Sequence, residues 1–147
     1  MNGYRSKSRE LVFQIIFGLN FYENKMDDYE EIINEFESEL KENDYEIDVK
    51  FLNKEYCLEI LNGIKFNQLK IDDLIQQNLK KWKLERLSKV DLSILRLATY
   101  EMCFKSLDPR IAINEAVNLS KKYSGDKSSS YINGVLNSIK DVQVEEN

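Results

Sequence analysis

The chain has 147 residues, of which 42% are hydrophobic and 32% are charged, a composition that is typical of one globular domain and excludes a disordered or fibrous protein. It contains no histidine, which excludes histidine-based acid–base catalysis and removes the commonest metal ligand. The formal net charge of −5, taken alone, argues against a nucleic-acid partner. With one proline and five glycines the chain has few helix breakers, so the composition predicts an all-α protein.

The first predicted element is a helix that begins with a basic cluster. Arg5, Lys7 and Arg9 are interleaved with serines, and Arg5 and Arg9, four residues apart, would share a helix face. The run LVFQIIFGLNF that follows has apolar residues at four-residue spacing and predicts a buried helix. It has no small-residue cleavage site of a signal peptide, and no run approaches the roughly 20 apolar residues that span a bilayer. The cluster is either a nucleic-acid contact or a solvated basic tail.

Within residues 22–50, the stretch YEEIINEFESEL predicts an acidic amphipathic helix. Residues 27–48 hold eleven acidic residues and one lysine, which is a local charge of −10, so the other 125 residues carry +5. Because the acidity is concentrated in one segment, the sequence is still compatible with a basic face elsewhere on the molecule.

The apolar spacing predicts one helix over residues 48–66, and the stretch KFNQLKIDDLIQQNLKKW, residues 65–82, restarts the pattern as a second helix. Asp72 and Asp73 are expected in the first turn of the second helix, where the helix dipole favours acids. Three lysines follow its end, and Trp82 among them is expected to anchor the core between helices. Cys57 and Cys103 lie far apart in apolar contexts and predict core thiols, which fit a reducing cytoplasm.

Residues 84–104 give the clearest helical pattern. Ser88 is a candidate N-cap, with Asp91 at the third position of a capping box. Arg96 and Glu101 fall among apolar residues and are expected to be paired inside the fold, with Glu115 as the candidate partner of Arg96.

Residues 108–139 predict two amphipathic helices joined by the loop SGDKSSS. Gly125 would provide a left-handed turn, and Asp126 and Ser128 are candidate N-caps of the second helix. A helix N-terminus beside Lys127 and free hydroxyls is a candidate anion site, although an ordinary capped helix start explains the same residues. Gly134 is expected to permit close helix packing.

Three ordered blocks, LERLSKVDLSILRLATYE, DPRIAINEAVNLSKKYS and SSSYINGVLNSI, resemble the carboxy-terminal half of the bacterial transcription antitermination family NusB. The resemblance is close over residues 67–139, weaker over residues 5–19 and vague between residues 22 and 50. It implies an all-α, compact single domain over residues 1–147, with about seven helices in two small helical sub-bundles. Residues 142–147 are expected to be a disordered tail.

The resemblance also implies a function without catalysis. Members of this family bind boxA-type single-stranded RNA in ribosomal RNA leader transcripts together with the ribosomal protein NusE, and they act in the RNA polymerase elongation complex with other Nus factors against premature termination. The implied location is cytoplasmic, without a membrane partner, and both a monomer and a homodimer stay open. Without a glycine-rich cofactor loop or a nucleophile–base pair, neither an enzyme nor a cofactor or metal site is expected.

The RNA contacts implied by the resemblance are carried by six residues, which are Arg5, Lys7, Arg9, Lys127, Ser128 and Tyr131. The basic side chains would hold phosphates, Ser128 would donate or accept a hydrogen bond, and Tyr131 would stack a base. Core packing is the competing interpretation of Tyr131. Ser6 and Ser8 stand where many relatives have arginines, which lowers the expected electrostatic affinity. A helical adaptor that binds only protein is therefore the alternative function.

Overall fold

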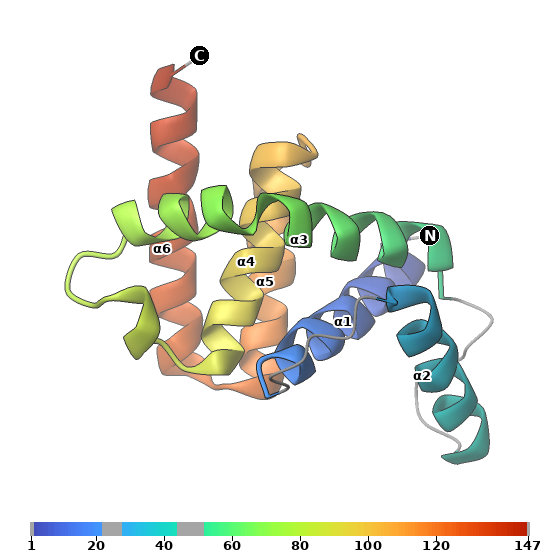
Figure 1. The fold of residues 1–147 in the computed structure, drawn as a ribbon. Coiled ribbons are helices and arrows are strands. Elements are labelled where there is room, and N and C mark those ends of the chain that lie inside the picture. Colours follow the sequence, from blue (N-terminus) through green and yellow to red (C-terminus); the bar gives the residue numbers. More distant parts are fainter. Residues whose placement is uncertain (1, 22–27, 44–51, 147) are drawn as a thin grey trace. The chain divides into compact units, whose positions relative to one another are not determined.

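The computed structural model describes residues 2–21, 28–43 and 52–146, and the regular structure in these ranges is helical (Figure 1). Six α-helices follow one another in these ranges, and a short 3₁₀ helix, η2, lies between the third and the fourth. Their bounds are α1 (Asn2–Leu19), α2 (Tyr29–Asn43), α3 (Lys54–Gln77), η2 (Leu84–Arg86), α4 (Lys89–Phe104), α5 (Pro109–Tyr123) and α6 (Asp126–Glu146). The predicted all-α class is confirmed, and the expected number of about seven helices is one too high for the described α-helices.

Helix α3 replaces the two helices that were predicted over residues 48–66 and in the stretch of residues 65–82. It runs without a break from Lys54 to Gln77. Its buried residues Ile60, Ile64, Ile71 and Ile75 are spaced by four, seven and four residues, which keeps them on one face of a single helix. Asp72 consequently lies near the carboxyl end of α3, so its placement in a first turn was wrong.

The described helices form two compact units, Met1–Asn62 and Gly63–Asn147. The first unit contains α1, α2 and residues 54–62 of α3, and the second contains the rest of α3 with η2, α4, α5 and α6. None of the described helices is both long and apolar enough to cross a membrane.

The core of the first unit comes from one face of each helix. The α1 residues Leu11, Val12 and Phe13 are at most 2% exposed, and Ile33 of α2 is equally buried. The N-terminal turn of α3 is tied to α1, because the Asn53 backbone N–H donates to the Ser8 hydroxyl at 3.0 Å. On α2, Glu30 and Glu31 are exposed in the first turn, as the predicted amphipathic acidic helix requires.

In the second unit α4, α5 and α6 pack against one another (Figure 1). The predicted N-cap Ser88 is confirmed, because its hydroxyl accepts the Asp91 backbone N–H at 3.1 Å. Helix α5 is capped by Asp108, whose carboxylate accepts the Arg110 backbone N–H, with Pro109 at the first helical position. Arg110 and Asp108 also form an exposed ion pair at 2.8 Å, and its hydrogen bonds lower the pKa of Asp108.

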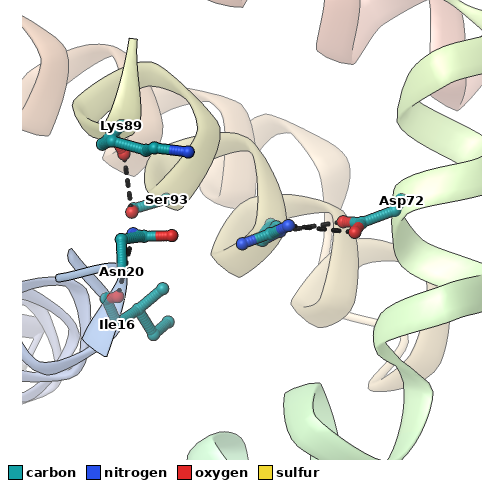
Figure 2. A network of polar contacts seen from close by, with 6 residues as sticks. Ile16, Asn20, Asp72, Lys89 and Ser93 are labelled. Atoms are coloured by element: carbon teal, nitrogen blue, oxygen red, sulfur yellow. Dashed lines mark hydrogen bonds and ion pairs between the residues drawn. The ribbon is translucent and has the colours of Figure 1, made fainter. Parts of the chain in front are cut away.

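The Arg96 guanidinium pairs with Asp72 on α3 rather than with Glu115. Its Nε donates to one carboxylate oxygen at 2.8 Å and its second N–H group donates to the other at 2.9 Å; Figure 2 shows both bonds at Asp72. The two side chains are 12% and 23% exposed. The prediction that Arg96 is paired inside the fold is confirmed, and the predicted partner was wrong, because α3 continues far enough to place Asp72 within reach.

Three further predictions differ from the structure. Trp82 is 53% exposed, so it is not a core anchor. A Cβ added at Gly134 would meet nothing within 4 Å, so no close packing requires this glycine, whereas a Cβ at Gly63 would overlap the Tyr100 ring. Helix α6 continues to Glu146, where a tail from residue 142 was expected. Of the cysteines, Cys57 is fully buried and Cys103 is half-buried.

Candidate nucleic-acid interface

The basic cluster lies on α1 and is held by an aromatic ring of α3. The guanidinium carbon of Arg5 lies 4.2 Å from the centroid of the Tyr56 ring, and that of Arg9 lies 5.8 Å from it. Arg5 and Arg9 therefore share a helix face, as their spacing predicts. Arg5 is exposed and Lys7 is half-buried, but Arg9 is only 6% exposed. Arg5 is accordingly the arginine of this cluster that is accessible to an anion in solution without a rearrangement.

Ser8 is a structural residue rather than a gap in the basic surface. It is fully buried, its hydroxyl accepts the Asn53 backbone N–H, and its carbonyl oxygen accepts the Cys57 thiol at 3.8 Å. A longer basic side chain at this position would displace the start of α3. The serine at position 8 therefore removes no charge from a solvent-facing site on this chain.

The corner between α5 and α6 is fixed by hydrogen bonds to α4. Gly125 has a φ of +136°, which side-chain-bearing residues rarely adopt, so the predicted need for glycine in this turn is confirmed. The Asp91 carboxylate, near the start of α4, accepts the Ser124 hydroxyl at 3.3 Å and the Ser128 hydroxyl at 3.2 Å. The Ser124 hydroxyl also donates to that of Ser128 at 2.8 Å.

These contacts change the interpretation of the serine-rich loop. Helix α6 begins at Asp126, so Asp126 and Ser128 lie in its first turn and are not N-caps. The Ser129 hydroxyl donates to the Gly125 carbonyl and shares a hydrogen bond with Ser120, both at 2.9 Å. Because the hydroxyls of Ser128 and Ser129 have partners inside the protein, the free hydroxyls that the anion site needs are not available at these two positions.

Lys127 and Tyr131 face the solvent to different degrees. Lys127 is exposed in the first turn of α6, and Tyr131, about one turn further on, is half-buried. The Tyr131 hydroxyl is buried and has no hydrogen-bond partner among the described residues. Burial, and to a smaller extent the nearby Asp91 charge, raises the pKa of Tyr131, so its hydroxyl stays protonated at neutral pH. The hydroxyl points into the protein, which leaves the ring as the part that a ligand can contact.

Tyr131 lines a cleft of about 440 Å³ that sequence reasoning missed. The segment that follows α3 also lines it, with Lys80, Lys81 and Trp82, all three exposed. The sequence signal was present as the string KKWK, because a tryptophan between lysines is an unusual core residue. Its size and apolar character favoured a buried position instead.

The structure thus brings together Lys127, Ser128 and Tyr131 at one corner of the second unit, and Arg5, Lys7 and Arg9 along one helix of the first. Because the resemblance assigns both groups to contacts with one RNA, they are expected to lie near one another in space, and that proximity stays a prediction.

A model of the NusB family matches residues 6–141, which is nearly the whole chain. One curated relative, the transcription antitermination protein NusB of Clostridium botulinum (strain Loch Maree / Type A3), is 50% identical over 135 residues. That alignment covers 90% of this chain and 96% of the relative. The sequence similarity is therefore not confined to the carboxy-terminal blocks.

Solved structures show the same fold. T. maritima NusB is 34% identical, has a TM-score of 0.72 and covers 92% of this chain, with 89% of its own chain aligned. A crystal structure of the antitermination factors NusB and NusE in complex with dsRNA has a TM-score of 0.75 at 24% identity, and the alignment covers 97% of this chain and 99% of that one.

Proposed function

The chain belongs to the NusB family, and from that membership we propose that it is a transcription antitermination factor that binds boxA-like RNA together with NusE. The observation that carries the proposal is the 50% identity to an antitermination protein over 90% of this chain. The solved complex of NusB and NusE with dsRNA supports the choice of partners. In this proposal the pair joins the RNA polymerase elongation complex with other Nus factors, in the cytoplasm, where transcripts are made. The whole chain acts as one NusB-like domain and has no catalytic role.

The contacts of the described residues divide the six proposed RNA-binding residues into two groups. Arg5, Lys7 and Lys127 are exposed or half-buried cations and hold phosphates, and the Tyr131 ring stacks a base. Arg9 is buried beside Tyr56, and the Ser128 hydroxyl is bonded to Asp91. These two contribute by positioning Tyr56 and the α5–α6 corner rather than by first contact with RNA.

The test is a titration of a boxA-like single-stranded RNA, and of its duplex, at several salt concentrations with and without NusE. Binding to a single strand should weaken with salt with a log–log slope of about −0.7 per phosphate contact. Arg5→Ala and Lys127→Ala should each reduce the magnitude of the slope by about 0.7. Lys70→Ala is the matched control, because Lys70 is an exposed lysine of α3 outside the proposed site.

Two outcomes would overturn parts of the proposal. No binding to either RNA at low salt, with NusE present, rejects the RNA function. Capture of NusE without RNA affinity then favours the protein-binding adaptor. Binding with an unchanged slope in Arg5→Ala and Lys127→Ala rejects the phosphate contacts alone.

A further inference from the structure

The cleft beside Tyr131 has two walls from distant parts of the chain. Trp82, in the segment after α3, lines it together with Tyr131 and Gly134 of α6. Its volume of about 440 Å³ is within the range of about 300–1,000 Å³ that is usual for small-molecule sites. The cleft is therefore large enough for a group the size of a nucleobase.

Hydrogen bonds fix both walls before any ligand arrives. The Ser138 hydroxyl of α6 donates to the Asn78 side chain at 2.6 Å. Gln76, in the last turn of α3, donates to the Trp82 carbonyl at 3.3 Å and accepts the Leu84 backbone N–H at 2.8 Å. The segment that carries Trp82 is thus hydrogen-bonded to α6 at its start and to α3 at its end. These bonds within the protein hold the cleft in shape without a ligand.

The composition of the cleft identifies the chemical class of its occupant. Trp82 is 53% exposed, although a large aromatic side chain gains most from burial. Lys80 and Lys81 are exposed at the same cleft, which gives it positive charge. Aromatic rings next to lysines match a single-stranded nucleic acid, in which bases stack and phosphates need cations. Gly134 has open space where a side chain would be, so the α6 wall admits a ligand close to the backbone.

We propose that this cleft holds one unpaired base of the bound RNA, stacked on Trp82, with Lys80 and Lys81 neutralising the adjacent phosphates. The inference rests on the proposed RNA-binding function and extends it by three residues. Tyr131 belongs both to the six proposed RNA-binding residues and to the lining of the cleft, so the RNA path continues from Lys127 along α6 into the cleft. A protein side chain is the competing occupant, and the experiment separates the two.

Trp82 is the only tryptophan of the chain, so the tryptophan fluorescence reports ligand contact at this residue alone. Titration of the full chain with a short boxA-like single-stranded RNA should quench the tryptophan fluorescence with the same midpoint as binding measured on labelled RNA. Trp82→Phe should keep most of the affinity and remove the signal. Trp82→Ala should weaken binding between about 5-fold and about 150-fold, which corresponds to the usual range for one stacked base.

Matched variants isolate each contact. Phe66→Ala removes another exposed aromatic, 88% exposed on α3 and outside the cleft, and should leave affinity unchanged. Lys80→Gln and Lys81→Gln should each reduce the magnitude of the salt slope by about 0.7, whereas Lys83→Gln, in the same segment but not at the cleft, should not. Circular dichroism of each variant confirms folding.

The outcomes keep the two proposals distinguishable. If the wild-type chain binds RNA but its fluorescence does not change, and Trp82→Ala binds as tightly as Phe66→Ala, the base-binding cleft is rejected and the RNA function stands. If Trp82→Ala loses NusE and keeps its RNA affinity, the cleft is a protein-docking surface and the inference is overturned. If the wild-type chain binds no RNA with NusE present, the proposed function fails and the cleft inference with it.

Discussion

At the scale of single residues, the ion pair between Arg96 and Asp72 connects α4 to α3. The guanidinium uses two N–H groups on the two oxygens of one carboxylate, at 2.8 and 2.9 Å. Paired, fork-like hydrogen bonds of this kind are stronger than single ones, and partial burial reduces competition from water. The pair therefore fixes the carboxyl-terminal part of α3 against α4.

Replacing Asp72 with Asn should lower the free energy of unfolding by about 1.5–3 kcal/mol, because the half-buried guanidinium loses its charged partner. Urea unfolding of Asp72→Asn and of Asp73→Asn, an exposed neighbour, provides the comparison. Equal unfolding midpoints for the two variants would show that the ion pair contributes nothing to stability.

The buried Cys57 thiol predicts a loss of stability at high pH. Burial raises its pKa from 9.0 to about 11, so the thiol loses its proton at pH 9 in the unfolded chain but only near pH 11 in the folded one. The stability that this neutral thiol contributes is present below pH 9 and is lost as the pH rises from 9 to about 11, by on the order of 2 kcal/mol.

The check is the free energy of unfolding of wild type and Cys57→Ala across this pH window. The variant should be less stable near neutral pH but should have a shallower decline between pH 9 and 11. Parallel pH profiles of the wild type and Cys57→Ala would contradict the raised pKa of the Cys57 thiol.

Local chemistry could be predicted from the sequence where the partners are neighbours in the chain. The N-cap Ser88 and the turn at Gly125 follow from residue type and spacing alone. The partner of Arg96 and the exposure of Trp82 depend instead on where α3 ends and what packs against it, which periodicity does not encode. For the candidate site, the resemblance implies Lys127 and Tyr131 as RNA contacts, and these stay predictions. The engaged Ser128 hydroxyl and the cleft arise from contacts between helices, which the sequence pattern does not encode.

At the scale of elements, the two glycines Gly63 and Gly134 lie inside long helices, α3 and α6, for different reasons. A side chain at Gly63 would collide with the Tyr100 ring, which also packs on Phe104 with ring centroids 5.7 Å apart. Gly134 faces open space at the cleft. One glycine permits close packing of α3 on α4, and the other does not.

Gly63→Ala should therefore lower stability by about 1–3 kcal/mol through overpacking, partly offset by the better helix propensity of alanine. Gly134→Ala should be neutral or raise stability by up to about 1 kcal/mol, since only helix propensity changes. Thermal unfolding followed by circular dichroism compares them. A Gly134→Ala variant that is destabilised as much as Gly63→Ala would refute the conclusion that only Gly63 permits close helix packing.

At the scale of the whole molecule, the two compact units share one helix. Residues 54–62 of α3 belong to the first unit and the remainder to the second. Because helix formation is cooperative, melting of one unit removes the support of its part of α3 and weakens the other part. The sequence predicts a single domain over residues 1–147, and the shared helix gives that prediction a physical basis.

The shared helix predicts one cooperative unfolding transition. Trp82 fluorescence reports on the second unit only, whereas far-ultraviolet circular dichroism reports on all helices. In urea the two signals should have the same midpoint, as expected for a two-state domain of this size. Separate midpoints would show that the units unfold independently and that the chain has two domains.

The contact between Arg5 and Tyr56 also has a consequence for binding entropy. A long side chain that becomes fixed only on binding costs about 0.5–1.5 kcal/mol in lost rotamer freedom. Arg5 already lies 4.2 Å from a ring that is itself 7% exposed, and a stacked guanidinium keeps N–H donors for other partners. An anion that binds Arg5 therefore meets a side chain whose rotamers were restricted when the protein folded. That entropy belongs to the free energy of folding, so a sparse basic cluster can bind more tightly than its charge alone suggests.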